Sequence, residues 1–87
     1  MTSFNELYRL IESRKITPVE NSRTNQLFEL GVHEIGKKLV EEASETWMAA
    51  EHETKDDLAL EASQLIYNLQ VLLVAKGITL EEIEEKL

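Results

Sequence analysis

The fold is decided by residues 32–76, which read VHEIGKKLVEEASETWMAAEHETKDDLALEASQLIYNLQVLLVAK. Helical periodicity runs through this stretch on both sides of the segment HETKDD, and no strand-like alternation interrupts it. The pattern predicts a long helix over about 32–51 and another over about 56–76. Gly77 supplies the left-handed residue that commonly ends a helix. Residues 32–76 are therefore expected to form two neighbouring helices joined by a turn.

Capping signals outside and inside this stretch place the other helix starts. Pairs typical of a capping box stand at Ser3 with Glu6, Thr54 with Asp57, and Thr79 with Glu82. They predict a first helix over about 4–13, confirm the turn before the second long helix, and open a short last helix. Thr24 or Asn25 is expected to cap a further short helix through Leu30, with Gly31 ending or bending it.

These elements predict an all-α fold, a bundle of three main helices plus short helices, in a single domain over residues 1–87. The chain has 43% apolar and 30% charged residues, a composition typical of folded, soluble proteins. At 87 residues it is near the small end of what can bury a core alone. We therefore expect the bundle to be completed by oligomerisation, as a homodimer or a higher homo-oligomer.

The charge and composition exclude several classes of function. The net charge is −8, with 17 acidic and 9 basic residues, so binding to a nucleic-acid backbone is not expected. A phosphorylated small molecule stays open, because a divalent cation held by carboxylates reverses the local charge. The absence of cysteine excludes thiol chemistry and suits a cytoplasmic location. We expect no signal peptide and no segment apolar enough to span a bilayer.

Polar residues break the apolar pattern on both long helices. On the helix over 32–51, the predicted core stripe is Ile35, Leu39, Ala43, Trp47 and Ala50. One edge of that stripe carries Lys38, Glu42 and Glu45. Surface charges normally lie opposite the core, so this placement is unusual.

The helix over 56–76 repeats the anomaly. Its main apolar stripe is Leu58, Ala62, Leu65, Leu69, Leu72 and Leu73, and a second apolar face carries Leu60, Tyr67, Val71 and Val74. A polar strip between them contains Glu61, Gln64 and Asn68. A helix that is apolar on two sides is buried on two sides, so we infer that the second face meets another subunit.

Two explanations account for carboxylates at the edge of a core. In the first, Lys38 neutralises Glu42 or Glu45 at helical spacing and the rest is a solvated edge. In the second, glutamates at positions i and i+3 face an acidic group on the neighbouring helix and hold Mg²⁺, which prefers oxygen ligands and often completes its shell with substrate phosphates. The spacing alone does not decide between them.

Several segments together resemble a known family. Residues 22–45, SRTNQLFELGVHEIGKKLVEEASE, resemble the N-terminal half of phosphoribosyl-ATP pyrophosphatase, and so do residues 61–72, EASQLIYNLQVL, followed by GITLEEI. The acidic blocks are similar to the E-E-x-x-E…E-x-x-D pattern of the wider MazG-like α-helical nucleotide pyrophosphohydrolases. This resemblance favours the metal-site explanation.

The resemblance implies a reaction and an assembly. Phosphoribosyl-ATP would be hydrolysed between its α and β phosphates to phosphoribosyl-AMP and pyrophosphate, the second step of histidine biosynthesis. It implies a requirement for Mg²⁺ and an oligomer with its sites near the subunit interface. Two alternatives stay open: a MazG-like house-cleaning enzyme acting on nucleoside triphosphates, and a non-catalytic helical dimerisation module.

The resemblance also assigns roles to individual residues. Glu42, Glu45 and Glu61 become Mg²⁺ ligands. Glu41 matches the first glutamate of the pattern and would bind a second ion, orient a water or act as the base. Lys38 is the other residue to which the resemblance assigns a catalytic role. Contacts to substrate phosphates are implied for Lys37, Lys38, Arg23 and Thr24.

One position departs from the family pattern. Gln64 stands where the pattern has aspartate. An amide oxygen can bind Mg²⁺, but it brings no negative charge and cannot act as a base. Gln64 is therefore expected either to complete a metal shell with one anion fewer or to bind through a water.

Overall fold

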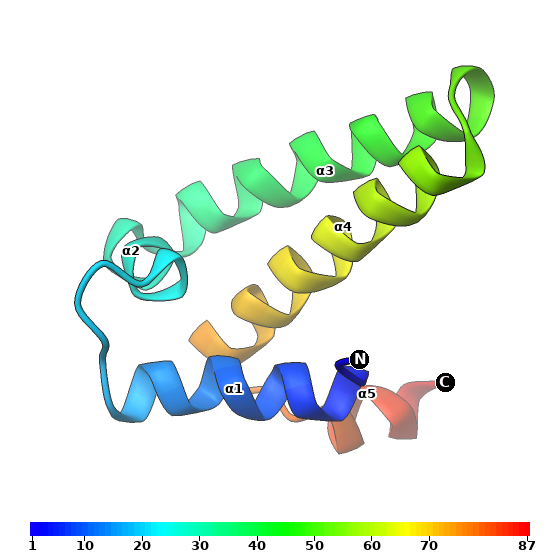
Figure 1. The fold of residues 1–87 in the computed structure, drawn as a ribbon. Helices are drawn as coiled ribbons and strands as arrows, with labels where there is room; N and C mark the ends of the chain where they lie inside the picture. The colour runs from blue at the N-terminus through cyan, green and yellow to red at the C-terminus, as the bar shows by residue number, and fades with distance from the viewer.

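The computed structural model describes residues 1–87 and contains five helices and no strand, so the all-α prediction is confirmed. The helices are α1 (Phe4–Ile16), α2 (Arg23–Leu30), α3 (Val32–His52), α4 (Lys55–Ala75) and α5 (Leu80–Lys86). Figure 1 shows α3 and α4 as a long antiparallel pair, with α1 crossing the C-terminal half of α4 and α2 beside the start of α3.

The turn between α3 and α4 is formed as predicted. Thr54 is the N-cap of α4: its hydroxyl accepts a hydrogen bond from the backbone N–H of Asp57, whose carboxylate accepts one in return from the N–H of Thr54. This capping box satisfies backbone donors that the first helical turn leaves without partners. The chain therefore reverses within two residues, and α4 returns along α3.

The helix ends agree with the prediction except near α1 and α2. Gly77 has a φ of 71° and follows the end of α4 as expected. Helix α1 continues to Ile16 rather than ending near Ser13. The cap predicted at Thr24 or Asn25 was wrong, because Ser22 is the N-cap of α2 and its hydroxyl accepts from the N–H of Asn25 at 3.3 Å. Asn25 instead uses its side chain to join α1 and α2, donating to the carbonyl of Arg14 at 2.7 Å.

The core lies where α1, α2, α3 and α4 meet. Its buried apolar members are Tyr8, Ile11, Leu27, Ile35, Val71 and Val74. The inference that the second apolar face of α4 meets another subunit was wrong for Val71 and Val74, which are covered by helices of the same chain. The sequence pattern recognised two apolar faces but did not show that the core takes residues from both: Val71 and Val74 of one face are buried, and Leu72 and Leu73 of the other pack against the same core.

The predicted core stripe of α3 was also partly wrong. Ile35, Glu42 and Ala49 are buried, whereas Ala43, Ala50 and Trp47 are exposed, Trp47 to 67%. The buried residues lie seven apart, the spacing expected where two helices pack along a shared seam. Because Ala43, Trp47 and Ala50 are apolar, they shifted the predicted centre of the stripe away from this seam.

Helix α4 also corrects the expectation that no segment is long and apolar enough to span a bilayer. By length and composition alone, its 21 residues are sufficient. However, Asn68 and Gln70 are buried inside the protein, and Glu61 lies against carboxylates of α3. The apolar character of α4 therefore belongs to a helix at the centre of a folded domain.

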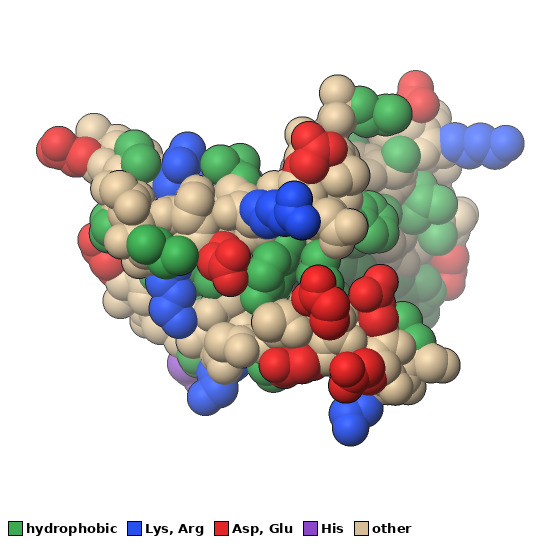
Figure 2. Space-filling model, turned by 90° about the horizontal axis from the view of Figure 1, so that it is seen from below, with side chains coloured by type: hydrophobic (Ala, Val, Ile, Leu, Met, Phe, Trp, Pro, Cys, Tyr) green, Lys and Arg blue, Asp and Glu red, His purple; other side chains and the backbone are tan.

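The last helix carries an acidic surface. Glu81, Glu82, Glu84 and Glu85 are all exposed on α5. The view from below shows Asp and Glu side chains gathered on the side of the molecule where α5 lies (Figure 2). This surface is a solvated helix face.

Candidate metal centre

Three glutamates from two helices converge in the seam between α3 and α4. Glu42 and Glu45 lie on α3, and Glu61 lies on α4. One carboxylate oxygen from each lies within 4.8 Å of the others. This cluster was predicted from the sequence, and the structure brings all three of its members together.

The hairpin explains why these residues meet. Glu42 and Glu45 are three residues apart, so they lie on neighbouring positions of one face of α3. The tight turn after His52 brings α4 back antiparallel, and Glu61 then lies opposite them across the seam. Because Glu42 shares the buried line of Ile35 and Ala49, its carboxylate is held inside the packing rather than in solvent.

Without a counter-charge, the carboxylates of the cluster repel one another, and two of their oxygens lack hydrogen-bond partners. Glu42 is 5% exposed, and the Oε2 atoms of Glu42 and Glu61 are buried without a hydrogen-bond partner. Burial, followed by the charge of Glu45, raises the pKa of Glu42, and Lys38 opposes this shift only in part. A hydrogen bond with Glu45, burial, and the charges of Glu45 and Glu42 raise the pKa of Glu61 to about 6.

The cluster fits a divalent cation. Carboxylate oxygens are the ligands that Mg²⁺ prefers, and the ion usually keeps several waters rather than a complete protein cage. Two buried oxygens without partners and two raised pKa values are the features that a bound positive charge would relieve.

Lys37, Lys38 and Glu41 lie outside the three-carboxylate cluster. They line a depression of about 330 Å³ between α2 and α3, together with Leu27, Leu30 and Glu34. Lys38 lies 3.8 Å from Glu41, and Lys37 lies 3.8 Å from Glu34. These exposed pairs are weak, so both lysines remain available to an anionic ligand.

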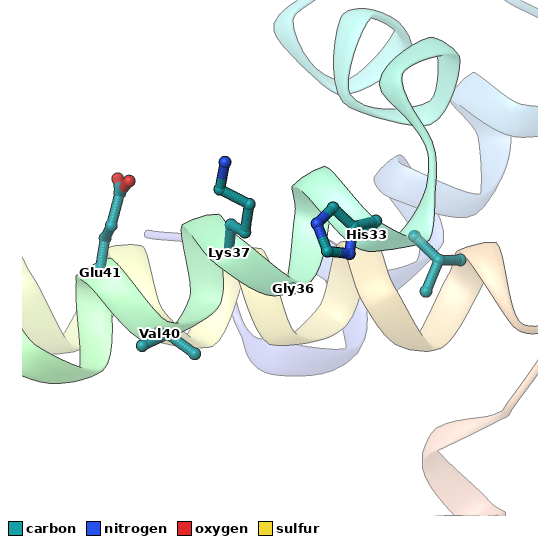
Figure 3. Close-up of a pocket in the computed structure, with 6 residues that line it drawn as sticks. His33, Gly36, Lys37, Val40 and Glu41 are labelled. Atoms are coloured by element: carbon teal, nitrogen blue, oxygen red, sulfur yellow. The ribbon is translucent and has the colours of Figure 1, made fainter.

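A second, shallower depression lies on the other side of Lys37 and Glu41. It has a volume of about 620 Å³ and is lined also by Val32, His33, Gly36 and Val40. In Figure 3, Lys37 and Glu41 project to one side of α3 and Val40 projects to the opposite side. Neither depression includes Glu42, Glu45 or Glu61, so the carboxylates do not lie in a closed pocket of the single chain.

Arg23 and Thr24 are placed at the start of α2, against α4. The hydroxyl of Thr24 is hydrogen-bonded to the hydroxyl of Tyr67 at 2.5 Å. The guanidinium of Arg23 lies 5.1 Å from the centre of the Tyr67 ring. Sequence reasoning interpreted Tyr67 as an interface residue and missed this contact. The only available signal was that Tyr67 follows Glu61 and Gln64 at intervals of three.

The polar strip of α4 leads from the carboxylates into the core. Gln64 is half-buried one turn beyond Glu61, and its backbone carbonyl accepts a hydrogen bond from the side chain of Asn68 at 2.8 Å. Asn68 is fully buried, and its Oδ1 has no partner. The strip predicted from the sequence is therefore enclosed only at Asn68, whereas Glu61 and Gln64 remain partly exposed in the single chain.

Comparisons with known proteins point in one direction. A family model described as phosphoribosyl-ATP pyrophosphohydrolase matches residues 4–87. The chain is 49% identical over 82 residues to the phosphoribosyl-ATP pyrophosphatases of Streptomyces coelicolor and Streptomyces avermitilis, covering 93% of this chain and 91% of each relative. It is 52% identical over 83 residues to the histidine biosynthesis bifunctional protein HisIE of Caldanaerobacter subterraneus subsp. tengcongensis. That match covers 95% of this chain and only 40% of the longer relative.

Proposed function

Because the chain belongs to the phosphoribosyl-ATP pyrophosphohydrolase family, we propose that it hydrolyses phosphoribosyl-ATP to phosphoribosyl-AMP and pyrophosphate, the second step of histidine biosynthesis. Water adds to a phosphorus of the α–β anhydride, the bridging P–O bond breaks, and a proton is released. The observation that carries this proposal is the cluster of Glu42, Glu45 and Glu61, which gives an acidic protein a means of binding a polyanion.

Glu42, Glu45 and Glu61 are proposed to hold Mg²⁺. The bound ion would neutralise phosphate charge and lower the pKa of a water molecule. In support, these side chains offer oxygens of the right kind on two rigid helices, and two of those oxygens are buried without partners. Gln64, one turn beyond Glu61 on α4, is proposed to add an uncharged oxygen to the shell, directly or through a water.

Residues outside this cluster are proposed to act on the substrate. Lys37 and Lys38 are proposed to contact oxygens of the triphosphate, which would stabilise the charge that develops as the anhydride breaks. Glu41, beside Lys38, is proposed to accept the proton of the attacking water or to orient that water. Their common position along one depression between α2 and α3 supports these roles.

A homodimer is proposed to complete the site. The main apolar stripe of α4 remains only half-buried, and Leu69 is 42% exposed. On α3, Val40 and Trp47 are 69% and 67% exposed. Apolar side chains exposed along two long helices are typical of a surface covered by another subunit. The carboxylates do not lie in a closed pocket of the single chain, which agrees with such a partner. We further propose that the enzyme is cytoplasmic.

The direct test is release of pyrophosphate from phosphoribosyl-ATP by the purified chain, with Mg²⁺ and with EDTA. We expect turnover in Mg²⁺ and its loss in EDTA, with recovery when Mg²⁺ is restored. Deoxynucleoside triphosphates serve as competing substrates in the same assay. Absence of release at micromolar enzyme would contradict the proposal, and faster turnover of deoxynucleoside triphosphates would assign the chain to house-cleaning instead.

A further inference from the structure

Arg23 is a cation that the folded chain holds in place without neutralising it. Its guanidinium lies over the ring of Tyr67, 5.1 Å from the ring centre, and no carboxylate forms an ion pair with it. Contact with an aromatic face orients a guanidinium but leaves its N–H donors free around the edge. Arg23 is exposed at the start of α2, so those donors are accessible to a ligand.

Tyr67 is itself fixed at its other end. Its hydroxyl is hydrogen-bonded to Thr24 at 2.5 Å, and Thr24 is 9% exposed. The tyrosine therefore bridges α4 and α2 and supports two consecutive residues of α2, one by its hydroxyl and one by its ring. Such support reduces the conformational entropy that Arg23 loses when it binds an anion.

Tyr67 also connects Arg23 to the carboxylate cluster. Glu61, Gln64 and Tyr67 lie three residues apart on α4, so each is a neighbour of the next on the helix surface. Glu61 and Tyr67 are separated by roughly 9 Å along the helix axis at 1.5 Å per residue. One end of this row faces carboxylates suited to a metal ion, and the other end carries a free guanidinium. The residue between them, Gln64, is uncharged.

Phosphoribosyl-ATP has two separate anionic groups that match this arrangement. One ribose carries the triphosphate, and the ribose of the phosphoribosyl group carries a phosphate monoester on the far side of the adenine ring. We propose that Arg23, positioned by Tyr67, binds this phosphate monoester while the triphosphate lies at the carboxylate cluster; the assignment rests on the proposed function. A guanidinium matches the geometry of a phosphate with two parallel hydrogen bonds.

The assignment makes Arg23 a determinant of specificity. Ordinary nucleoside triphosphates lack the separate phosphate monoester of the phosphoribosyl group, so Arg23 would not strengthen their binding. It also gives a physical reason for glutamine at position 64, because a carboxylate there would place a negative charge between the metal-binding end and the phosphate-binding end of the row. Gln64 leaves the attraction between Arg23 and a phosphate unopposed.

The test is steady-state kinetics of Arg23→Gln, Arg23→Lys and Tyr67→Phe with phosphoribosyl-ATP. Hydrogen bonds to charged groups predict a KM raised about tenfold or more in Arg23→Gln, with kcat nearly unchanged. Arg23→Lys keeps the charge and should recover part of the loss. Tyr67→Phe keeps the ring but loses the bond to Thr24, and should raise KM by a smaller factor. Arg9→Gln, an exposed arginine of α1, is the matched control and should behave as wild type.

Product-fragment inhibition provides a readout that a purely structural role would not produce. Ribose 5-phosphate should inhibit Arg23→Gln less than wild type, whereas pyrophosphate should inhibit both equally. Reduced kcat at unchanged KM, or equal loss of inhibition by the two fragments, would overturn the assignment. If wild type releases no pyrophosphate from phosphoribosyl-ATP, the proposed function fails. NMR titration of wild type and Arg23→Gln with ribose 5-phosphate then decides whether Arg23 binds a sugar phosphate: shifts lost in the variant support this, and unchanged shifts refute it.

Discussion

At the scale of single residues, the main electrostatic repulsion in the folded chain lies among three glutamate side chains. Glu42, Glu45 and Glu61 lie together in the seam of the α3–α4 hairpin, and two of their oxygens are buried without a partner. Buried carboxylate oxygens without a counter-charge oppose folding, and a cation bound at this cluster, as proposed, would offset that cost. If these residues hold the proposed ion, they link stability to catalysis, so substitutions should lower activity without lowering the stability of the metal-free protein.

Glu42→Gln and Glu45→Gln should each abolish turnover while leaving the fold intact. Loss of one ligand is expected to reduce activity by about 100-fold or more, since even residues supporting a metal ligand account for 10- to 100-fold effects. In EDTA, each variant should melt at the same temperature as wild type or higher, because repulsion within the cluster is relieved. Pyrophosphate release and thermal melts provide the measurement. Glu53→Gln removes an exposed carboxylate outside the cluster and is the control; wild-type turnover in either cluster variant would reject the ligand assignment.

The stability of the metal-free protein should decrease as the pH rises through about 6. The pKa of Glu61 is about 6 in the folded chain against an ordinary value of 4.5, so the folded state binds this proton more tightly than the unfolded state. Its contribution to the free energy of unfolding is present below pH 4.5 and is lost as the pH rises past 6. The raised pKa of Glu42 acts in the same direction.

Urea unfolding in EDTA between pH 4 and 8 measures this dependence, and Glu61→Gln isolates it. As the pH rises, the free energy of unfolding of wild type should fall relative to that of Glu61→Gln. Saturating Mg²⁺ should cancel the trend, because the ion binds the charged carboxylates. A difference that stays constant across the range would show that Glu61 does not share a proton with its neighbours.

At the scale of elements, the α3–α4 hairpin positions the site. Its geometry depends on a short turn closed by the capping box of Thr54 and Asp57. The side chains of the cluster come from both arms, so any change in how the arms meet alters the separation of Glu61 from Glu42 and Glu45. The elements also show where sequence periodicity is insufficient: α4 has two apolar faces, and the packing of α1, α2 and α3 against it decides how much of each face is covered.

Thr54→Ala should lower the free energy of unfolding by about 1 kcal/mol, the usual cost of losing a helix N-cap. The hydroxyl of Thr54 accepts from the N–H of Asp57 and donates to its carboxylate, and alanine can do neither. Ser63→Ala is the matched control, because the exposed hydroxyl of Ser63 donates to the backbone carbonyl of Leu60 within α4 itself and caps no helix end. Chemical unfolding of both variants measures the effect, and equal stabilities would show that the turn does not depend on its cap.

At the scale of the whole molecule, a single chain does not cover its own apolar surface. The buried apolar core contains six residues, whereas Val40, Trp47 and Leu69 are all exposed by more than two fifths. A small domain with so few buried residues gains much of its stability from a partner. The proposed dimer would also close the open side of the metal centre.

Leu69→Lys should convert the proposed dimer into a monomer. A charge in the middle of an apolar interface must lose its hydration when the partner binds, which strongly weakens association. Sedimentation velocity at several protein concentrations measures the assembly. Ile16→Lys introduces the same charge at an exposed position at the end of α1 and should leave the dimer intact. A monomeric wild type at micromolar concentration would refute the proposed assembly.

Local information in the sequence was sufficient for the order of the helices and most of their ends, and for the unusual charges on the two long helices, whereas the family resemblance selected Glu42, Glu45 and Glu61 as the cluster. Capping pairs such as Thr54 with Asp57 act within one turn of helix, so they can be recognised without knowing the rest of the fold. The same is true of the glutamates: Glu42 and Glu45 share a helix face because they are three residues apart, and a charge on the edge of an apolar stripe is visible in the sequence itself.

The tertiary structure alone decided which apolar faces are buried and which residues meet across helices. Val71 and Val74 became core because α1, α2 and α3 pack together against that side of α4. Trp47 became exposed because the seam of α3 runs through Ile35, Glu42 and Ala49 instead. Tyr67 joined Arg23 and Thr24 where α2 meets α4. Periodicity records the apolar faces of a helix but not which neighbour covers each one. That choice depends on contacts between residues far apart in the chain, and those contacts exist only when all the helices have packed together.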